Sequence, residues 1–174
     1  MITLRCTLKV RKRLRLAATP SDSSPPTTAL GDWYVNLVHF GRQQVVMATS
    51  ERSLLTVLLP ARELRQSLVP NLQSAAEQLL IALGIPPDTV NREIAAMQPT
   101  AFASAVNRRV LGSMNDFAWQ LGAYLDRTND ALELAQYLCD TPMSAVGSRY
   151  RLGIPADVAR ELLSAHYAAS PFRH

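Results

Sequence analysis

The chain has 174 residues, 48% of them hydrophobic, which is enough for one domain with a sizeable core. Its formal charge of +4 is uneven, because six basic residues precede the first acidic residue: Arg5, Lys9, Arg11, Lys12, Arg13 and Arg15. The rest of the chain is net negative, which argues against a nucleic-acid-binding domain of the ordinary, broadly basic type.

The N-terminal residues predict one strand and then a basic segment. Ile2–Thr7 alternates apolar and polar residues, the period of a half-buried strand. Leu8–Leu16 either extends this strand or forms a short basic helix. Thr19–Thr28 is a polar, proline-rich loop, because proline fixes φ and removes a backbone donor. We expect this loop to be too short to separate two domains.

A β-hairpin follows, and it is the clearest local pattern in the chain. Tyr34–Phe40 and Gln43–Thr49 are β-rich runs on either side of Gly41-Arg42. A third apolar run, Leu54–Leu59, ends at Pro60. With the N-terminal strand these runs predict an antiparallel meander.

From Pro60 the hydrophobic period becomes helical. The predicted helices lie within 61–83 (interrupted by Pro70 and stopped by Gly84), 87–97, 109–125, 129–139 and 156–168. Gln98–Ala105 is ambiguous, and one alternative is a strand that returns to the sheet. Strands followed by helices predict a single α+β domain over 1–174, with an antiparallel sheet of about four to five strands against C-terminal helices. We expect its core to contain Leu4, Val35, Leu37, Val46, Leu58, Leu79, Leu111, Phe117 and Leu121.

The two cysteines, Cys6 and Cys139, are far apart in apolar surroundings. We expect both to be buried and reduced in a soluble, cytoplasmic protein without a secretory leader. No apolar run approaches the roughly 18 residues of a membrane-spanning helix. Metal-ligand spacing and phosphate loops are missing, so we expect no metal and no cofactor. His39, His166 and His174 form no recognisable catalytic set, and we assign no catalytic residue.

The run Asn107–Phe117 is the best candidate for a site, because polar groups in an apolar setting must be hydrogen-bonded or kept for a ligand. Asn107 is placed to cap the helix that follows. Arg108, Leu111 and Asn115 share a helix face at spacings of three and four. The candidate residues of the run are Asn107, Arg108, Arg109, Asn115 and Asp116. A structural polar network is favoured over a ligand site, which stays as the alternative.

Two further pairs are candidates for binding. Glu51-Arg52 lies between two strands; a solvated turn pair is the favoured interpretation, and an arginine held for an anion is the alternative. Asp32-Trp33 opens the hairpin. There the tryptophan either covers the sheet edge or anchors a partner.

The sequence resembles an uncharacterised bacterial family, a domain of unknown function. The motifs that carry the resemblance are Ile2–Thr7, Ala29–Leu37, Ser50–Leu55 with Pro60–Leu64, and Asn107–Phe117. The resemblance extends over nearly the whole chain to about Pro142. It implies a compact domain and supplies no catalytic residues.

Two hypotheses for function follow. The first is a non-enzymatic binding, interaction or regulatory protein whose partner is another protein. The second is an enzyme for a phosphate-containing or nucleic-acid substrate, with Arg52, Arg108 and Arg109 as anion clamps and Asp32, Glu51 or Asp116 as acid/base groups. Nucleic acid is a further candidate partner for the strip Arg11, Lys12, Arg13 and Arg15. The favoured interpretation of this strip is a solvated surface.

Overall fold

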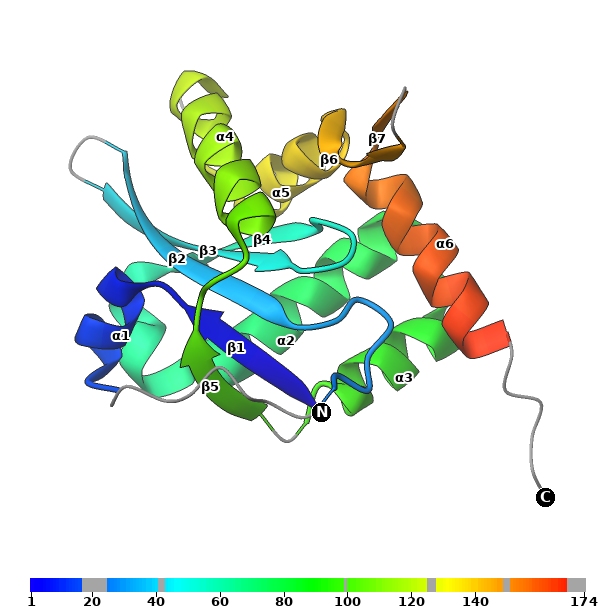
Figure 1. The fold of residues 1–174 in the computed structure, drawn as a ribbon, viewed down its shortest axis with the longest axis horizontal. Helices are drawn as coiled ribbons and strands as arrows, with labels where there is room; N and C mark the ends of the chain where they lie inside the picture. The colour runs from blue at the N-terminus through cyan, green and yellow to red at the C-terminus, as the bar shows by residue number, and fades with distance from the viewer. Residues whose placement is uncertain (17–24, 41–42, 99, 125–127, 149–150, 169–174) are drawn as a thin grey trace.

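The fold is built on a five-stranded sheet. The computed structural model describes residues 1–16, 25–40, 43–98, 100–124, 128–148 and 151–168. In spatial order the strands are β4 (Thr56–Pro60), β3 (Gln43–Ser50), β2 (Trp33–Phe40), β1 (Ile2–Cys6) and β5 (Thr100–Ser104). Figure 1 shows helices on both sides of this sheet. The predicted α+β class is confirmed.

The sheet is mixed, so the prediction of a purely antiparallel sheet was wrong. β2, β3 and β4 form the expected antiparallel meander, but β1 runs parallel to both β2 and β5. Leu8–Leu16 explains the difference, because it forms the helix α1 (Leu8–Leu14) instead of extending the strand. Parallel neighbours need a crossover connection, usually a helix, and α1 with the loop after it supplies one.

The second half of the chain forms five helices and a small hairpin among the described residues. The helices are α2 (Leu64–Ala82), α3 (Pro87–Ala96), α4 (Arg108–Tyr124), α5 (Ala131–Cys139) and α6 (Pro155–Ala168). A 3-10 turn, η1 (Ala61–Glu63), leads into α2, which continues past Pro70 with non-helical backbone angles at Ser67. The hairpin β6 (Met143–Ser148) and β7 (Arg151–Gly153) was not predicted. The strand alternative for Gln98–Ala105 is confirmed by β5.

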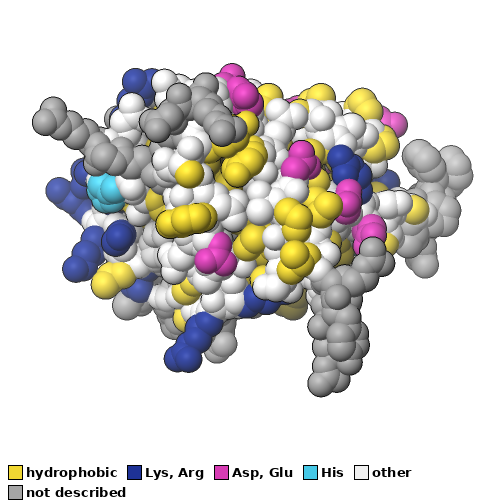
Figure 2. Space-filling view, turned by 90° about the horizontal axis from the view of Figure 1, so that it is seen from above, with side chains coloured by type: hydrophobic (Ala, Val, Ile, Leu, Met, Phe, Trp, Pro, Cys, Tyr) yellow, Lys and Arg dark blue, Asp and Glu magenta, His cyan; other side chains and the backbone are white. Residues whose placement is uncertain are grey.

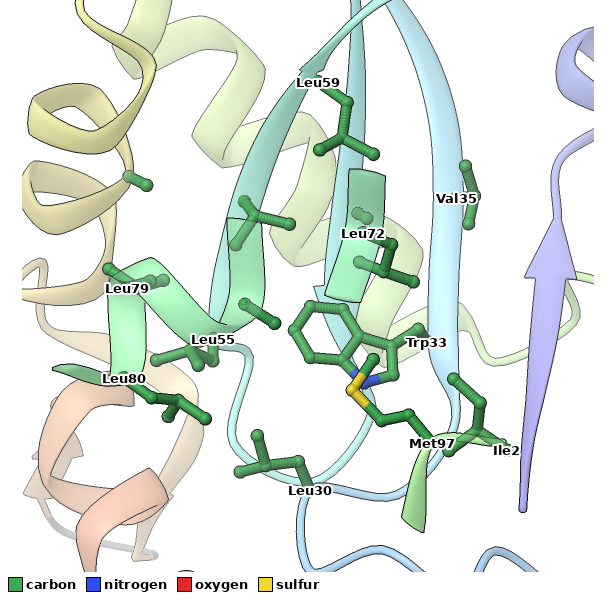
Figure 3. Close-up of a cluster of buried hydrophobic side chains, with 14 of the residues drawn as sticks. Ile2, Leu30, Trp33, Val35, Leu55, Leu59, Leu72, Leu79, Leu80 and Met97 are labelled. Carbon is green, nitrogen blue, oxygen red and sulfur yellow. The ribbon is translucent and has the colours of Figure 1, made fainter. Parts of the chain in front are cut away.

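Each face of the sheet has its own hydrophobic cluster, because successive strand residues point to opposite faces. The larger cluster lies under α2, α3 and α6 and contains Leu4, Val35 and Trp33. Figure 3 shows Trp33 between Leu72 and Met97 in this cluster. The second cluster lies under α4 and α5 and contains Phe117.

Most of the predicted core is buried. The members that the structure buries are Leu4, Val35, Leu37, Val46, Leu58, Leu79, Phe117 and Leu121. Leu111 is only partly buried, at the edge of the second cluster. The third predicted strand begins later than expected, because Leu54 adopts a positive φ and the chain turns there before β4. The predicted turn Gly41-Arg42 and most of the predicted loop 19–28 lie outside the described residues.

Both cysteines are free and buried, as predicted. Burial is the main reason that the pKa of each thiol, Cys6 and Cys139, is raised to about 12. Cys139 lies against the edge strand β4, where its sulfur accepts a hydrogen bond from the Thr56 backbone N–H. No helix of the described chain is both long and apolar enough to cross a membrane.

Candidate functional site: a polar junction and an exposed aromatic surface

Asp32 forms a buried ion pair with Arg5 of β1. The Arg5 Nε lies 2.8 Å from the Asp32 Oδ2, and the two side chains are 14% and 2% exposed. The other carboxylate oxygen accepts a hydrogen bond from the Thr3 backbone N–H at 2.9 Å. Both oxygens of Asp32 therefore bind β1, and the residue fastens the start of β2 to its parallel neighbour.

The loop before Asp32 is held by two charged side chains. Glu93 of α3 is fully buried, and its oxygens accept hydrogen bonds from the backbone N–H groups of Ala29 and Leu30. On the other side, Arg52 Nη1 donates to the carbonyl oxygens of Thr28 and Ala29, each at 3.2 Å. Arg52 thus holds the loop in place of pairing with Glu51.

Gly31 is required in this loop. Its φ of +79° is a conformation that L-residues with a side chain rarely adopt, and a Cβ there would lie 3.0 Å from Arg52 Cγ. The close approach of the Arg52 side chain to the backbone therefore depends on glycine.

Glu51 connects the sheet to the start of α4. Its Oε1 accepts long hydrogen bonds from the Tyr34 hydroxyl at 3.4 Å and from Asn107 Nδ2 at 3.3 Å. The Asn107 side-chain oxygen accepts from the backbone N–H of Arg109 at 3.0 Å, so the predicted helix cap is present. Burial, reinforced by the Glu51 carboxylate, raises the pKa of Tyr34 to about 12.

Arg109 joins the same region from the first turn of α4. One guanidinium nitrogen donates to the Glu51 carbonyl oxygen at 2.8 Å, and another to the Ala145 carbonyl oxygen of β6 at 2.9 Å. We call this assembly the polar junction. Its members are Arg5, Asp32, Tyr34, Glu51, Arg52, Asn107 and Arg109.

The contacts of the polar junction hold elements together. Arg52 and Arg109, assigned as anion clamps in the enzyme hypothesis, each donate to two backbone carbonyls. Asp32, assigned there as an acid or base, accepts from Thr3 and Arg5. A substrate phosphate would have to displace these hydrogen bonds. The arrangement therefore favours the structural network over proton transfer or anion binding.

The remaining candidates of the long helix lie apart from the polar junction, on its outer surface. Arg108, Asn115 and Asp116 are exposed. Asp116 instead lines an open hollow of about 380 Å³ between α4 and the β6–β7 hairpin. The other lining side chains include Trp119, Gln120, Met143 and Leu152.

Trp119 is the most exposed large hydrophobic residue of the described chain, at 79%. Leu152 of β7, on the same hollow, is 62% exposed. Figure 2 looks onto the side where α4, α5 and the β6–β7 hairpin lie, and shows hydrophobic and acidic side chains interspersed there. We call the surface formed by Asp116, Trp119, Gln120 and Leu152 the Trp119 surface.

Trp33 and the basic strip lie elsewhere. Trp33 is fully buried in the larger cluster, on the sheet face opposite Tyr34, so its indole contacts the core and not solvent. The strip Arg11, Lys12 and Arg13 lies on α1, and Arg15 ends this helix in a left-handed conformation. Among the described residues no three His, Cys, Asp or Glu side chains form a group that could hold a metal ion.

Comparison with known proteins places the chain in a family. A family model described as a domain of unknown function, DUF6933, matches residues 3–157. The chain belongs to the DUF6933 family. The matched range runs from β1 into α6, so in this DUF6933 chain it includes both the polar junction and the Trp119 surface. No curated protein and no solved structure matches the chain.

The residues of this DUF6933 chain that were not recognised as candidates from the sequence are Arg5, Tyr34, Glu93, Trp119, Gln120 and Leu152. Arg5 had a visible signal, because it is a charged residue inside an apolar alternation. Trp119 also had one: it follows Asn115 and Asp116 by four and three positions, so it lies on the polar face of its helix. Glu93 had none, since its partners at Ala29 and Leu30 are distant in sequence.

Proposed function

We propose that this chain is a non-enzymatic interaction module that binds another protein through the Trp119 surface. The observation that carries the proposal is the 79% exposure of Trp119 on a helix whose opposite face is packed into the core. Tryptophan is enriched among the residues that contribute most binding energy in protein interfaces. A regulatory role through such a partner is consistent with the same surface.

The position of Trp119 on α4 supports recognition. The buried residues of the helix recur at core spacing and are Val110, Ser113, Met114, Phe117 and Leu121. Trp119 lies outside this stripe and contributes little to the core. Met143 and Leu152 of the β6–β7 hairpin border the same hollow. A partner side chain can therefore enter a formed recess beside the indole.

The chemistry of the Trp119 surface defines the partner. The indole ring and Leu152 present apolar area, whereas Asp116 contributes a carboxylate on the same helix face. A lysine or arginine can pair with Asp116 while it stacks on the indole, a cation–π contact. We therefore expect a protein segment that presents an apolar side chain next to a basic one.

Selection from a phage-displayed peptide library tests this proposal. The selection uses the wild-type chain and removes phage that also bind Trp119→Ala. We expect enriched peptides to combine an apolar with a basic residue. A synthetic peptide of that consensus should shift the fluorescence of Trp119 and should lose about 2 kcal/mol of binding free energy against Trp119→Ala.

Matched variants separate the contribution of the Trp119 indole from that of the Asp116 carboxylate. Trp119→Phe should retain part of the peptide affinity, and Asp116→Asn should weaken only peptides that carry the basic residue. Failure to enrich peptides that depend on Trp119 would overturn the proposal. Concentration-dependent dimerisation that Trp119→Ala abolishes would also overturn it, since the occupant would then be a second copy of the chain.

A further inference from the structure

Seven basic side chains gather at one end of the molecule, from two segments far apart in sequence. Five belong to α1 and the residues beside it, and two belong to η1 and the start of α2. They are Lys9, Arg11, Lys12, Arg13, Arg15, Arg62 and Arg65. The chain has eighteen Lys and Arg and fourteen Asp and Glu residues. The two segments contain seven of the basic residues and one acidic residue, Glu63, so the rest of the chain has eleven basic and thirteen acidic residues. The positive charge of the protein is therefore local.

Direct contacts join the two segments. The Arg65 Nε donates to the Arg13 carbonyl oxygen at 2.7 Å, which fixes the start of α2 against the last turn of α1. Arg62 lies three positions earlier, on η1, and both arginines are exposed. Figure 2 shows Lys and Arg side chains concentrated at the left end of the molecule, where Figure 1 places α1.

The packing of α1 turns Lys9, Lys12 and Arg13 outward, whereas Arg11 is half-buried and its Nη1 donates to the Ser104 hydroxyl at 2.7 Å. Val10 is buried and Leu14 packs against the larger cluster, and these two residues are four positions apart on the inner face. Lys9, Lys12 and Arg13 share another face at spacings of three and four, and all three are exposed.

Helix stability accounts for Lys12 and Arg13, which lie in the last turn of α1, but not for Lys9. Basic residues stabilise the last turn of a helix but oppose the dipole in its first turn. Lys9 lies in the first turn of α1, where no acidic residue offsets it. The exposed face of α1 is therefore more positive than its own folding requires.

We propose that this basic end, defined by the seven residues above, binds the phosphate backbone of nucleic acid without base specificity. A seven-residue helix is about 10 Å long, and each strand of duplex DNA carries one phosphate per about 3.4 Å of axis, so α1 can lie along about three phosphates of one strand. A lipid surface is less suitable, because the exposed side of α1 carries one large apolar side chain, Leu8, among the basic ones.

Fluorescence anisotropy of a short labelled DNA duplex tests the proposal across a salt series. Contact with three phosphates gives a slope of log affinity on log salt of about −2.7, which is a loss of about 40-fold between about 50 and 200 mM salt. The variant Lys9→Gln/Lys12→Gln/Arg13→Gln removes the three cations of the outer face. We expect its salt slope to become clearly shallower and its affinity at low salt to fall at least tenfold.

The control is a charge-matched variant on other elements, Arg92→Gln/Arg108→Gln/Arg160→Gln. It lowers the net charge equally, and it should retain most of the affinity and the salt slope. A second test variant, Arg62→Gln/Arg65→Gln, leaves α1 unchanged and should also reduce the slope if the two segments form one surface. It keeps the proposal testable should the triple α1 variant fail to fold.

Several results would overturn the proposal. They are no duplex binding by the wild-type chain at about 50 mM salt, equal losses in the α1 variant and the charge-matched control, and binding of polyglutamate as tight as that of the duplex. Binding to vesicles that contain phosphatidylserine, without binding to the duplex, would assign the basic end to a membrane surface instead.

Discussion

The two ends of α4 use polar and aromatic residues in opposite ways. At the first turn, Asn107 and Arg109 are bonded to backbone groups and to Glu51, and they fasten the helix to the sheet and to β6. Further along the helix, Asp116 and Trp119 face an open hollow. In the first region the polar side chains bond to other parts of the protein, whereas in the second region the side chains are exposed and available to a partner.

This contrast shows why an unusual local sequence is a weak guide to a binding surface. The run Asn107–Phe117 attracts attention because polar groups interrupt an apolar pattern, and the structure explains its first residues by internal hydrogen bonds. The signal of Trp119 is of the opposite kind, an apolar residue on the polar face of the same helix. Exposure in the folded state distinguishes the two, and exposure depends on the elements that pack nearby.

The largest expected effect breaks the polar junction. Asp32→Ala removes the carboxylate from the buried Arg5 pair and the acceptor of the Thr3 N–H. Loss of one partner of a buried ion pair costs about 3 to 5 kcal/mol, because the other charge stays desolvated. Urea unfolding should show a loss of about 3 kcal/mol.

The control for this prediction lies on the Trp119 surface. Asp116→Ala removes an exposed carboxylate and should change the free energy of unfolding by no more than about 0.5 kcal/mol. Similar losses in Asp32→Ala and Asp116→Ala would contradict the distinction between the two regions.

A smaller effect is expected at the cap of α4. Asn107→Ala removes the oxygen that accepts the Arg109 N–H and should cost about 1 kcal/mol in urea unfolding. Asn107→Asp keeps an acceptor for the cap but places a second carboxylate beside Glu51. In the double variant Asn107→Asp/Glu51→Gln, the glutamine amide can donate a hydrogen bond to the new aspartate, so the donor and acceptor are exchanged. The double variant should therefore be more stable than Asn107→Asp alone. Equal stability would show that the contact with Glu51 contributes nothing.

The pH dependence of stability tests Tyr34 in the same junction. Its pKa is raised from 10.0 to about 12, so the folded state favours the neutral phenol. The resulting stabilisation is complete below pH 10 and is lost as the pH rises through about 12. Between these values the wild-type chain should lose unfolding free energy faster than Tyr34→Phe. Parallel pH profiles of the two proteins would refute a raised pKa at Tyr34.

Local features of the fold were predictable, and long-range ones were not. The hairpin of β2 and β3 and the amphipathic α4 follow from residue periodicity within each segment. The parallel placement of β1 depends on whether Leu8–Leu16 is a helix or a strand, and its pattern permits both. If Leu8–Leu16 were a strand, the N-terminal strand could belong to the antiparallel meander. Because the segment contains the helix α1, β1 instead pairs with β2 in the parallel direction.

In the candidate site, too, local interactions were predictable and long-range ones were not. The cap at Asn107 is a local interaction and was predicted correctly. The roles of Arg52 and Glu93 depend on the loop at Thr28–Leu30, whose position is set only when α3 and the sheet come together. A charged residue whose partner is remote in sequence gives no local signal. For this reason Arg52 was read as a turn residue or an anion clamp, and Glu93 was not considered.

The smallest effect on stability is expected at Trp119, which gives the sharpest test of the contrast. The chain has two tryptophans, Trp33 fully buried and Trp119 79% exposed. Trp119→Phe should change the free energy of unfolding by no more than about 0.5 kcal/mol. Acrylamide should quench part of the wild-type fluorescence and almost none of the emission of Trp119→Phe, which should also be blue-shifted because only the core indole remains.

A quenchable component that persists in Trp119→Phe would mean that Trp33 is accessible and that the packing of the larger cluster is looser than described. Protection of Trp119 that increases with the concentration of the wild-type chain would instead show a second copy on the Trp119 surface. Exposure that is independent of concentration leaves the indole available to a different protein. That outcome is the condition on which the proposed interaction depends.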